Sequence, residues 1–368
     1  MKRHIYATAA ALVCGLFALA EAPQQAPPQP AKPAGQAKPA GQQTEQPPPT
    51  FVGGVSEVIV PVTVTDDKGR FVSNLVQSDF RVLDEGRPQR IEFFNHNEKQ
   101  PIVVGFLVDL SSASVIHWKN YKEAIQELIW GLLPGDKRYS GYLVGYGNEA
   151  QLLINTTSDG ETMGQTIDRL KPGGGSAFYD AIYMACTRRE IVQGEPYEPR
   201  RVIVIIGDGH DNTSHHSFDE VLEIAKRQMV TIYGVSTVSY GFTAAEQSSL
   251  ERLASETGGR VEYPMNTLYR DVSGYISTPR DAGNYVYEPG SGGYASERLR
   301  GIVKAVQSIQ GDVTTQYVLR YRPDIDADTR SKLFRRIKVE IPDLPNAKVY
   351  YRDGYYPLPA SATPRGGQ

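Results

Sequence analysis

Cysteine is almost absent from this chain of 368 residues, which has only Cys14 and Cys186. Cys14 lies in an N-terminal apolar stretch that reads as a cleavable leader, so Cys186 would be the one cysteine of the mature protein. A chain with one cysteine forms no intramolecular disulfide, which excludes a disulfide-stapled extracellular scaffold. Cys186 lies in a helical pattern, and we expect it to be a small buried apolar residue.

The chain also lacks an excess of charge of either sign. Its formal net charge is −3, and loss of Lys2 and Arg3 with the leader would change it to −5. Proteins that bind nucleic acid need a basic face to neutralise phosphates. The sequence therefore argues against a nucleic-acid partner.

The common motifs of catalysis are missing as well. There is no Gly-Lys-Ser/Thr phosphate loop, and no Gly-x-Gly-x-x-Gly follows a strand. The run Gly174-Gly175-Ser176-Ala177 lacks the last glycine of a nucleophile elbow. The sequence thus predicts a protein that is not an enzyme, and an exported hydrolase is the least favoured alternative.

Residues 1–20 have the pattern of a secretory signal peptide. Lys2 and Arg3 form a basic start, the apolar stretch 5–19 is too short to span a bilayer, and Ala18-Leu19-Ala20 is a small-x-small cleavage site. Val13 is too large for a lipoprotein signal at Cys14. No other segment is apolar enough to be transmembrane. We expect an exported mature chain that is periplasmic, on the cell surface or secreted, in a bacterial envelope.

Two segments, 21–50 near the N-terminus and 358–368 at the C-terminus, are predicted to be disordered. Residues 21–50 hold nine of the 25 prolines and a tandem Ala-Lys-Pro-Ala-Gly-Gln repeat. Such a segment cannot bury a core and reads as an extended linker. Residues 358–368 are expected to be a disordered tail.

Two separated segments, 51–97 and 312–357, alternate apolar and polar residues with the period of β-strands. Pro61 interrupts the first of these strands and favours an edge position for it. Three short strands alone would be marginal. We therefore expect the two segments to form one β-sandwich with another domain inserted between them. The alternative is two separate small β elements that pack on the central domain.

Residues 101–265 alternate strands and helices, which predicts an α/β fold with a doubly wound, mostly parallel sheet and helices on both faces. A connecting segment, 266–311, follows and contains a Tyr- and Gly-rich loop at 273–295 whose role the sequence does not define. Two continuous apolar runs in the central domain, 102–108 and 202–206, predict strands that are buried on both faces.

Each of these two runs leads into an aspartate in a turn of small residues. Asp109 follows the first run and Asp208 the second, and Ser111, Ser114 and Ser176 lie in loops of the same domain. Because ligands bind at the carboxyl ends of the strands in such folds, we expect these oxygens to lie at one edge. Carboxylate and hydroxyl oxygens are suited to a hard cation.

This order of motifs resembles the von Willebrand factor type A domain. Asp-x-Ser follows the first strand, a Gly-rich loop with a hydroxyl precedes the helix that begins Phe178-Tyr179-Asp180, and Gly-Asp-Gly follows a later strand. The resemblance covers about residues 101–265. With Thr63–Gly69 upstream and Arg352–Tyr356 downstream, the layout is also similar to exported bacterial von Willebrand factor A-related proteins.

The resemblance implies a metal-ion-dependent adhesion site. Its two aspartates would be Asp109 and Asp208, its first serine Ser111, and its threonine Ser176. The second serine of the family pattern is Ala113 here, and Ser114 could substitute for it if the loop slips by one residue. The expected ion is Mg²⁺, with Mn²⁺ or Ca²⁺ as alternatives.

Two hypotheses of function remain open. In the first, an exported, adhesion-type binding protein captures an exposed acidic residue of a protein partner through the cation. In the second, the domain has lost the ion and is a structural or interaction module that binds through its Tyr-rich loop or its β-sandwich. The second hypothesis would leave Asp109 to cap the following helix.

Overall fold

The computed structural model describes residues 57–96, 101–187, 200–237, 244–265, 292–323 and 334–357. The predicted leader, linker and tail lie outside these ranges, as does most of the loop 273–295. Within the described part of the chain, no helix has the length and apolar character needed to cross a membrane.

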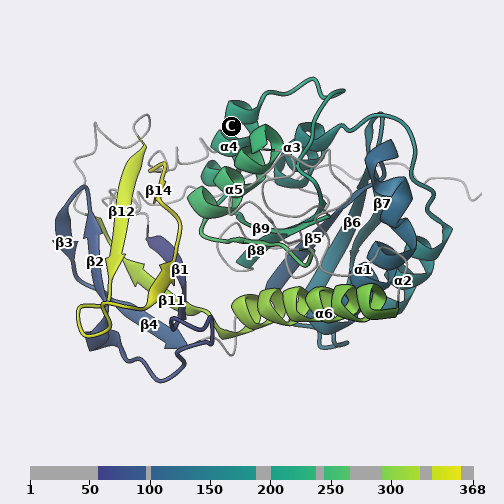
Figure 1. The fold of residues 1–368 in the computed structure, drawn as a ribbon. Helices are drawn as coiled ribbons and strands as arrows, with labels where there is room; N and C mark the ends of the chain where they lie inside the picture. The colour runs from purple at the N-terminus through teal and green to yellow at the C-terminus, as the bar shows by residue number, and fades with distance from the viewer. Residues whose placement is uncertain are drawn as a thin grey trace, which may run out of the picture. The chain divides into compact units, whose positions relative to one another are not determined.

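The central part of the chain is a six-stranded sheet flanked by helices (Figure 1). Its strand order is β10-β9-β8-β5-β6-β7, and every neighbouring pair is parallel except the hairpin of β6 and β7. The strands are β5 (Ile102–Asp109), β6 (Tyr139–Tyr146), β7 (Ala150–Thr157), β8 (Arg200–Gly207), β9 (Thr231–Ser236) and β10 (Val261–Glu262). The predicted doubly wound, mostly parallel sheet is therefore confirmed.

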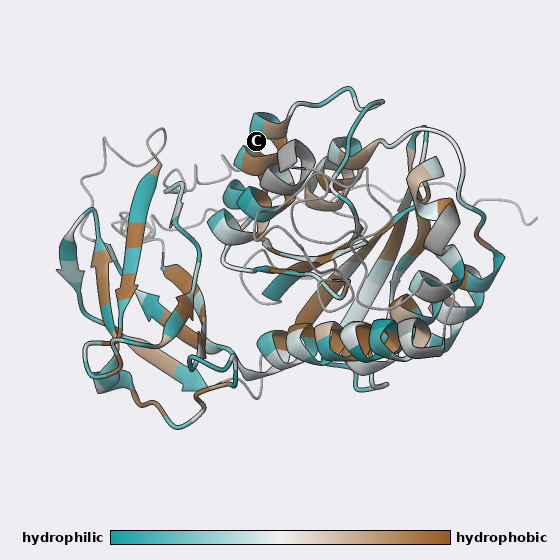
Figure 2. Cartoon of the chain, in the orientation of Figure 1, coloured by the Kyte–Doolittle hydropathy of each residue, from teal (hydrophilic) through white to brown (hydrophobic). Residues whose placement is uncertain are grey.

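Helices cover both faces of this sheet. The helices are α1 (Trp118–Leu132), α2 (Gly160–Arg169), α3 (Phe178–Thr187), α4 (Phe218–Arg227), α5 (Ala244–Thr257) and α6 (Gly292–Thr315). Apolar residues of α1, α2 and α6 form one core with the sheet, and those of α3, α4 and α5 form a second core on its other face. Figure 2 shows the apolar residues along the central strands, as burial on both faces requires.

The register of β5 and β8 sets the positions of the two aspartates. The strands lie side by side and parallel, with Val108 opposite Ile206, so Asp109 is level with Gly207 and one residue from Asp208. Both apolar runs end at the same edge of the sheet. The chain therefore places two carboxylates together where two buried, neighbouring strands end.

The N- and C-terminal parts of the described chain form two four-stranded antiparallel sheets, in the orders β13-β1-β11-β4 and β14-β12-β2-β3. Strands before the α/β domain are β1 (Val58–Thr65), β2 (Arg81–Asp84), β3 (Arg87–Gln89) and β4 (Phe93–His96), and those after it are β11 (Tyr317–Tyr321), β12 (Arg335–Glu340), β13 (Lys348–Tyr350) and β14 (Gly354–Tyr355). Each sheet takes strands from both segments, and one core joins them. The predicted fold class, a domain inserted in a β-sandwich built from both segments, is confirmed.

The expectation that Pro61 marks an edge strand is wrong for β1 as a whole. β1 lies between β11 and β13 in its sheet. β13, however, pairs only with Thr63–Thr65, whereas β11 pairs with Val58–Val62. Among the described residues, the stretch around Pro61 therefore has a strand on one side only, as proline in a sheet usually does.

A buried carboxylate joins the two sheets of the sandwich. Asp84 of β2 is fully buried and accepts hydrogen bonds from the hydroxyls of Tyr321 at 3.0 Å and Tyr355 at 2.9 Å. Arg335 forms an ion pair with its other oxygen at 2.7 Å. These partners come from β11, β14 and β12, all after the inserted domain. Asp84 therefore links the two halves of the sandwich across the insertion.

We predict that Asp84→Ala destabilises the protein by about 3–5 kcal/mol, because it leaves two buried hydroxyls and a guanidinium without their partner. Urea unfolding of the purified protein measures this change. Asp66→Ala, which removes an aspartate from an exposed turn, is the control and should have a much smaller effect. Equal losses of stability in the two variants would contradict this role of Asp84.

Candidate metal centre

Asp109, the last residue of β5, is at the centre of the candidate site. Its side chain is buried, and its Oδ1 accepts a hydrogen bond from the backbone N–H of Ser111 at 2.7 Å. Its Oδ2 is buried and has no hydrogen-bond partner among the described residues. Asp109 does not cap the following helix, since the residue at that cap is Ser111. The carboxylate therefore keeps one oxygen free.

The loop after Asp109 turns two serines inward and the alanine outward. A 3-10 helix, Ser112–His117, precedes α1, and the N–H of Ser114 in it bonds the carbonyl of Ser111 at 3.1 Å. This tight turn buries Ser111 and Ser114 and leaves Ala113 exposed. Position 113 thus faces away from the carboxylate, and Ser114 lies inward.

The Gly-rich loop brings Ser176 to the same edge. Ser176 is 1 % exposed, and its hydroxyl donates to the carbonyl oxygen of His210 at 2.7 Å. Asn212 accepts from the N–H of Ser176 at 2.7 Å, and Asn148 accepts from the N–H of Gly175 at 2.6 Å. A hydroxyl that donates to a carbonyl still has its lone pairs for another partner.

Asp208 lies next to the same loop. It is 8 % exposed, and its Oδ1 accepts from the N–H of His210 at 2.9 Å. Ser176 and Asp208 are therefore joined through one residue, His210. The structure brings Asp109, Ser111, Ser114, Ser176 and Asp208 together at the edge where the sequence placed them.

The pKa of Asp109 is raised, chiefly because its side chain is buried. Burial raises it above the ordinary value of 3.8, the hydrogen bonds from Ser111 lower it, and the charge of Asp208 raises it further. Ser114 also lowers this pKa, so its hydroxyl lies close to Asp109 although the two form no regular hydrogen bond. No lysine or arginine is among the main influences. Among the described residues, no basic side chain therefore offsets the charge of Asp109 to a leading degree.

Three buried oxygens near the site have no hydrogen-bond partner among the described residues, and they show whether the site suits a cation. They are Asp109 Oδ2, Ser114 Oγ and Tyr146 Oη. Buried polar atoms in proteins nearly always have a partner, so a cluster without one indicates that a group belongs there. Within the described ranges, no three His, Cys, Asp or Glu side chains form a metal cage. The candidate site has only two such side chains, Asp109 and Asp208. Together with several serine hydroxyls, two carboxylates still suit a hard cation.

A second polar cluster borders the site. Asp180, in the first turn of α3, accepts from the backbone N–H and ring Nδ1 groups of His215 and His216. Burial raises its pKa, but these hydrogen bonds prevail and lower it to about 2. His216 also stacks on Tyr183, with ring centroids 3.7 Å apart. The cluster therefore fixes the loop after Asp208 onto α3.

Several residues of the site were not found from the sequence. Asn148 and Asn212 hold the Gly-rich loop, and Tyr146 lies beneath the carboxylates. Their only signal was position, because Tyr146 ends β6 and the two asparagines lie in loops after strands of the sheet. Asparagine and tyrosine are too common in such turns for that signal to identify them.

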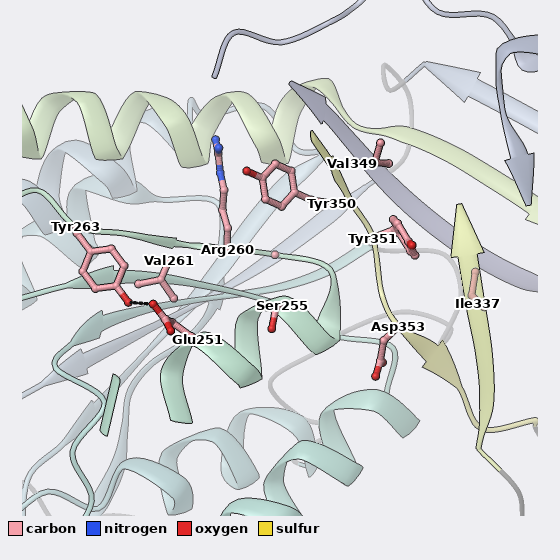
Figure 3. Close-up of a pocket in the computed structure, with 11 residues that line it drawn as sticks. Glu251, Ser255, Arg260, Val261, Tyr263, Ile337, Val349, Tyr350, Tyr351 and Asp353 are labelled. Atoms are coloured by element: carbon pink, nitrogen blue, oxygen red, sulfur yellow. Dashed lines mark hydrogen bonds between the residues drawn. The ribbon is translucent and has the colours of Figure 1, made fainter. Parts of the chain in front are cut away.

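A cleft of about 580 Å³ lies elsewhere, between α5 and β10 on one side and β12 and β13 on the other (Figure 3). Its charged groups already have partners. Arg260 pairs with Asp312 at 2.8 Å, Asp353 pairs with Lys226 at 3.1 Å, and Tyr263 donates to Glu251 at 2.7 Å. We therefore assign it to the packing between the sandwich and the α/β domain.

The sheet and its helices define an α/β domain of the doubly wound class. Residues 104–269 match the family model of the von Willebrand factor type A domain. This part of the chain is therefore a von Willebrand factor type A domain, as its sequence motifs suggested.

Solved structures give further similarities. The VWA domain of SpRpn10 is 17% identical over 44% of this chain and 86% of its own, with a TM-score of 0.35. The conserved hypothetical protein BatB from Bacteroides thetaiotaomicron is 17% identical over 58% of this chain and 97% of its own, with a TM-score of 0.35.

Proximal thread matrix protein 1 from the mussel byssus, with a zinc-occupied MIDAS motif, is 18% identical over 46% of this chain and has a TM-score of 0.36. The match covers 42% of that protein's chain. A search of curated proteins finds no match.

We predict that the protein without metal becomes less stable as pH rises from about 3.8 through the raised pKa of Asp109. In that interval the unfolded chain has released the proton and the folded chain still holds it, so ionisation of Asp109 favours unfolding. Urea unfolding in chelator from pH 4 to 7 measures this, with Asp109→Asn as the comparison. The stability difference between the two proteins should change with pH, and a constant difference would contradict the prediction.

Proposed function

We propose that the von Willebrand factor type A domain binds a divalent cation, Mg²⁺ first of all, and uses it to capture a carboxylate of a protein partner. The ligands we propose are Asp109, Ser111, Ser114, Ser176 and Asp208. The observation that supports this most is the buried carboxylate of Asp109, which lies near Asp208 and has no lysine or arginine among the main influences on its pKa. Beside it lie buried oxygens that have no hydrogen-bond partner among the described residues. Domains of this family are commonly protein-interaction modules, and we propose that this one is not an enzyme.

The mixture of ligands suits capture of an anion. Mg²⁺ prefers six oxygens near an octahedron and usually keeps some water. Two carboxylates balance the charge of the ion, and the serine hydroxyls add oxygens without adding negative charge. The ion then still attracts a further carboxylate at a position that water would otherwise hold.

The rim of the site consists of small residues. Ser112, Ala113, Gly173 and Gly174 are all exposed. The N–H of Ser112 bonds the carbonyl of Gly174 at 3.0 Å, and the N–H of Gly174 bonds Ser112 Oγ at 3.0 Å. These bonds join the two loops, and the rim has no large side chain among these four residues. We therefore infer that an acidic side chain of a partner could reach the ion from this side.

The departure from the family pattern at Ala113 favours a second candidate function. In it, the domain has lost the ion and binds through the sandwich or the loop 273–295, most of which lies outside the described residues. The burial of Ser114 next to Asp109 favours the first candidate, because it supplies the hydroxyl that Ala113 lacks. For either function, the sequence of residues 1–20 leads us to propose an exported protein of the bacterial envelope.

Mg²⁺ should raise the thermal stability of the purified protein. By mass action, an ion at about 100 times its dissociation constant stabilises by about 2.7 kcal/mol. Asp109→Ala should abolish the shift, and Asp219→Ala, at an exposed position of α4, should keep it. An unchanged melting temperature in Mg²⁺ and in chelator would favour the second candidate function.

Ser114→Ala should weaken Mg²⁺ binding about tenfold or more, equivalent to about 1.4 kcal/mol. Ala113→Ser should change the affinity less than threefold, because position 113 is exposed in the 3-10 turn. Isothermal titration of Mg²⁺ into each variant compares them. A gain from Ala113→Ser with no loss from Ser114→Ala would show that residue 113 occupies the ligand position.

Capture of a carboxylate should depend on the ion. A poly-glutamate peptide is expected to bind the Mg²⁺-loaded protein and to dissociate in chelator, and a poly-glutamine peptide of equal length is the control. Fluorescence anisotropy of the labelled peptides follows both. Binding of poly-glutamate that persists in chelator and in Asp109→Ala would contradict capture through a cation.

A further inference from the structure

Tyr146 ends β6 at the same edge as the candidate site. It is the register partner of Asp109 in the parallel ladder of β5 and β6. Its ring is buried and packs at a tilt on Phe178, with ring centroids 5.7 Å apart. Its hydroxyl reaches β8, because a Cβ on Gly207 would lie only 2.3 Å from Tyr146 Oη. Since β5 lies between β6 and β8, the side chain crosses beneath Asp109.

The hydroxyl of Tyr146 is fully buried and has no hydrogen-bond partner in the part of the chain that the structure describes. The free oxygen of Asp109 is close to it, since Asp109 Oδ2 lies 3.5 Å from the same Cβ position of Gly207. Burial raises the pKa of Tyr146 well above its usual range, and the charges of Asp109, Asp208 and Asp211 raise it further. A neutral donor thus lies among three carboxylates and beside an oxygen that lacks a donor.

Tyr142, on the same strand, provides an internal comparison. It is also buried, and a Cβ on Gly105 would lie 2.3 Å from its hydroxyl. The hydroxyl of Tyr142 is 3.4 Å from the carbonyl oxygen of Ala185 and donates to it. A tyrosine that packs over a strand glycine can therefore still form a hydrogen bond through its hydroxyl. The lack of a hydrogen bond at the Tyr146 hydroxyl among the described residues requires a separate explanation.

We propose that Tyr146 is a positioning residue of the cation site, whose hydroxyl donates a hydrogen bond to Asp109 Oδ2 when the ion is bound. This inference rests on the proposed function. A carboxylate that ligates a metal is commonly held by a donor outside the ligand shell. A phenol supplies that donor without a positive charge, so it neither competes with the ion nor weakens its attraction for a partner's carboxylate.

The test is titration of Mg²⁺ alone into the purified wild-type protein, Tyr146→Phe and Tyr142→Phe, measured by calorimetry. We expect Tyr146→Phe to lower the affinity 10- to 100-fold, the usual effect of removing a donor that orients a ligand. Tyr142→Phe should bind as the wild type does. Urea unfolding of both variants without metal checks that each retains the fold.

A tyrosine difference spectrum provides a readout that a loss of packing would not change. Mg²⁺ should alter the near-ultraviolet absorbance of the wild-type protein as the phenol becomes a donor. The signal should be absent in Tyr146→Phe and retained in Tyr142→Phe.

The outcomes separate the two proposals. If the wild type binds no Mg²⁺, both the proposed function and this inference are overturned. If the wild type binds and Tyr146→Phe binds equally well, only the role of Tyr146 is overturned. Should Tyr146→Phe not fold, the wild-type spectrum decides, since Mg²⁺ binding without a tyrosine signal would also overturn that role.

Discussion

Burial of the Asp109 carboxylate close to Asp208 is the constraint on which the candidate site depends. Two carboxylates at the end of a buried sheet destabilise the fold unless a positive charge lies between them. The main influences on the pKa of Asp109 include no lysine or arginine, and its Oδ2 has no donor. The surrounding polar groups are backbone N–H donors and neutral hydroxyls. This arrangement is explained if the counter-charge is a cation that binds from solution.

The fold was predictable where a pattern has one structural solution. The continuous apolar runs before Asp109 and Gly207 fit only strands buried on both faces, and β5 and β8 are such strands. The sandwich was predictable because the three short strands predicted in the first segment would be marginal alone, and the last segment offers the missing partners. Asp84 could not be found in this way, because its partners lie more than 230 residues along the chain. A contact of that kind depends on the finished packing.

The site was predictable in part, for a related reason. Strand ends and the family motifs placed the two aspartates, Ser111 and Ser176 at one edge. The orientation of Ala113 and Ser114 depends on a short 3-10 turn that local sequence does not define. Tyr146 was missed because its hydroxyl reaches the site from a neighbouring strand, across the glycine at position 207. Its role depends on sheet register rather than on spacing along the chain.

The most direct test of the cation site is a crystal of the protein soaked in Mn²⁺, with anomalous diffraction to locate the ion. We expect one strong anomalous peak within about 2.3 Å of oxygens of the proposed ligands, Asp109, Ser111, Ser114, Ser176 and Asp208. A peak at His215 and His216, or no peak at this edge of the sheet, would contradict this expectation.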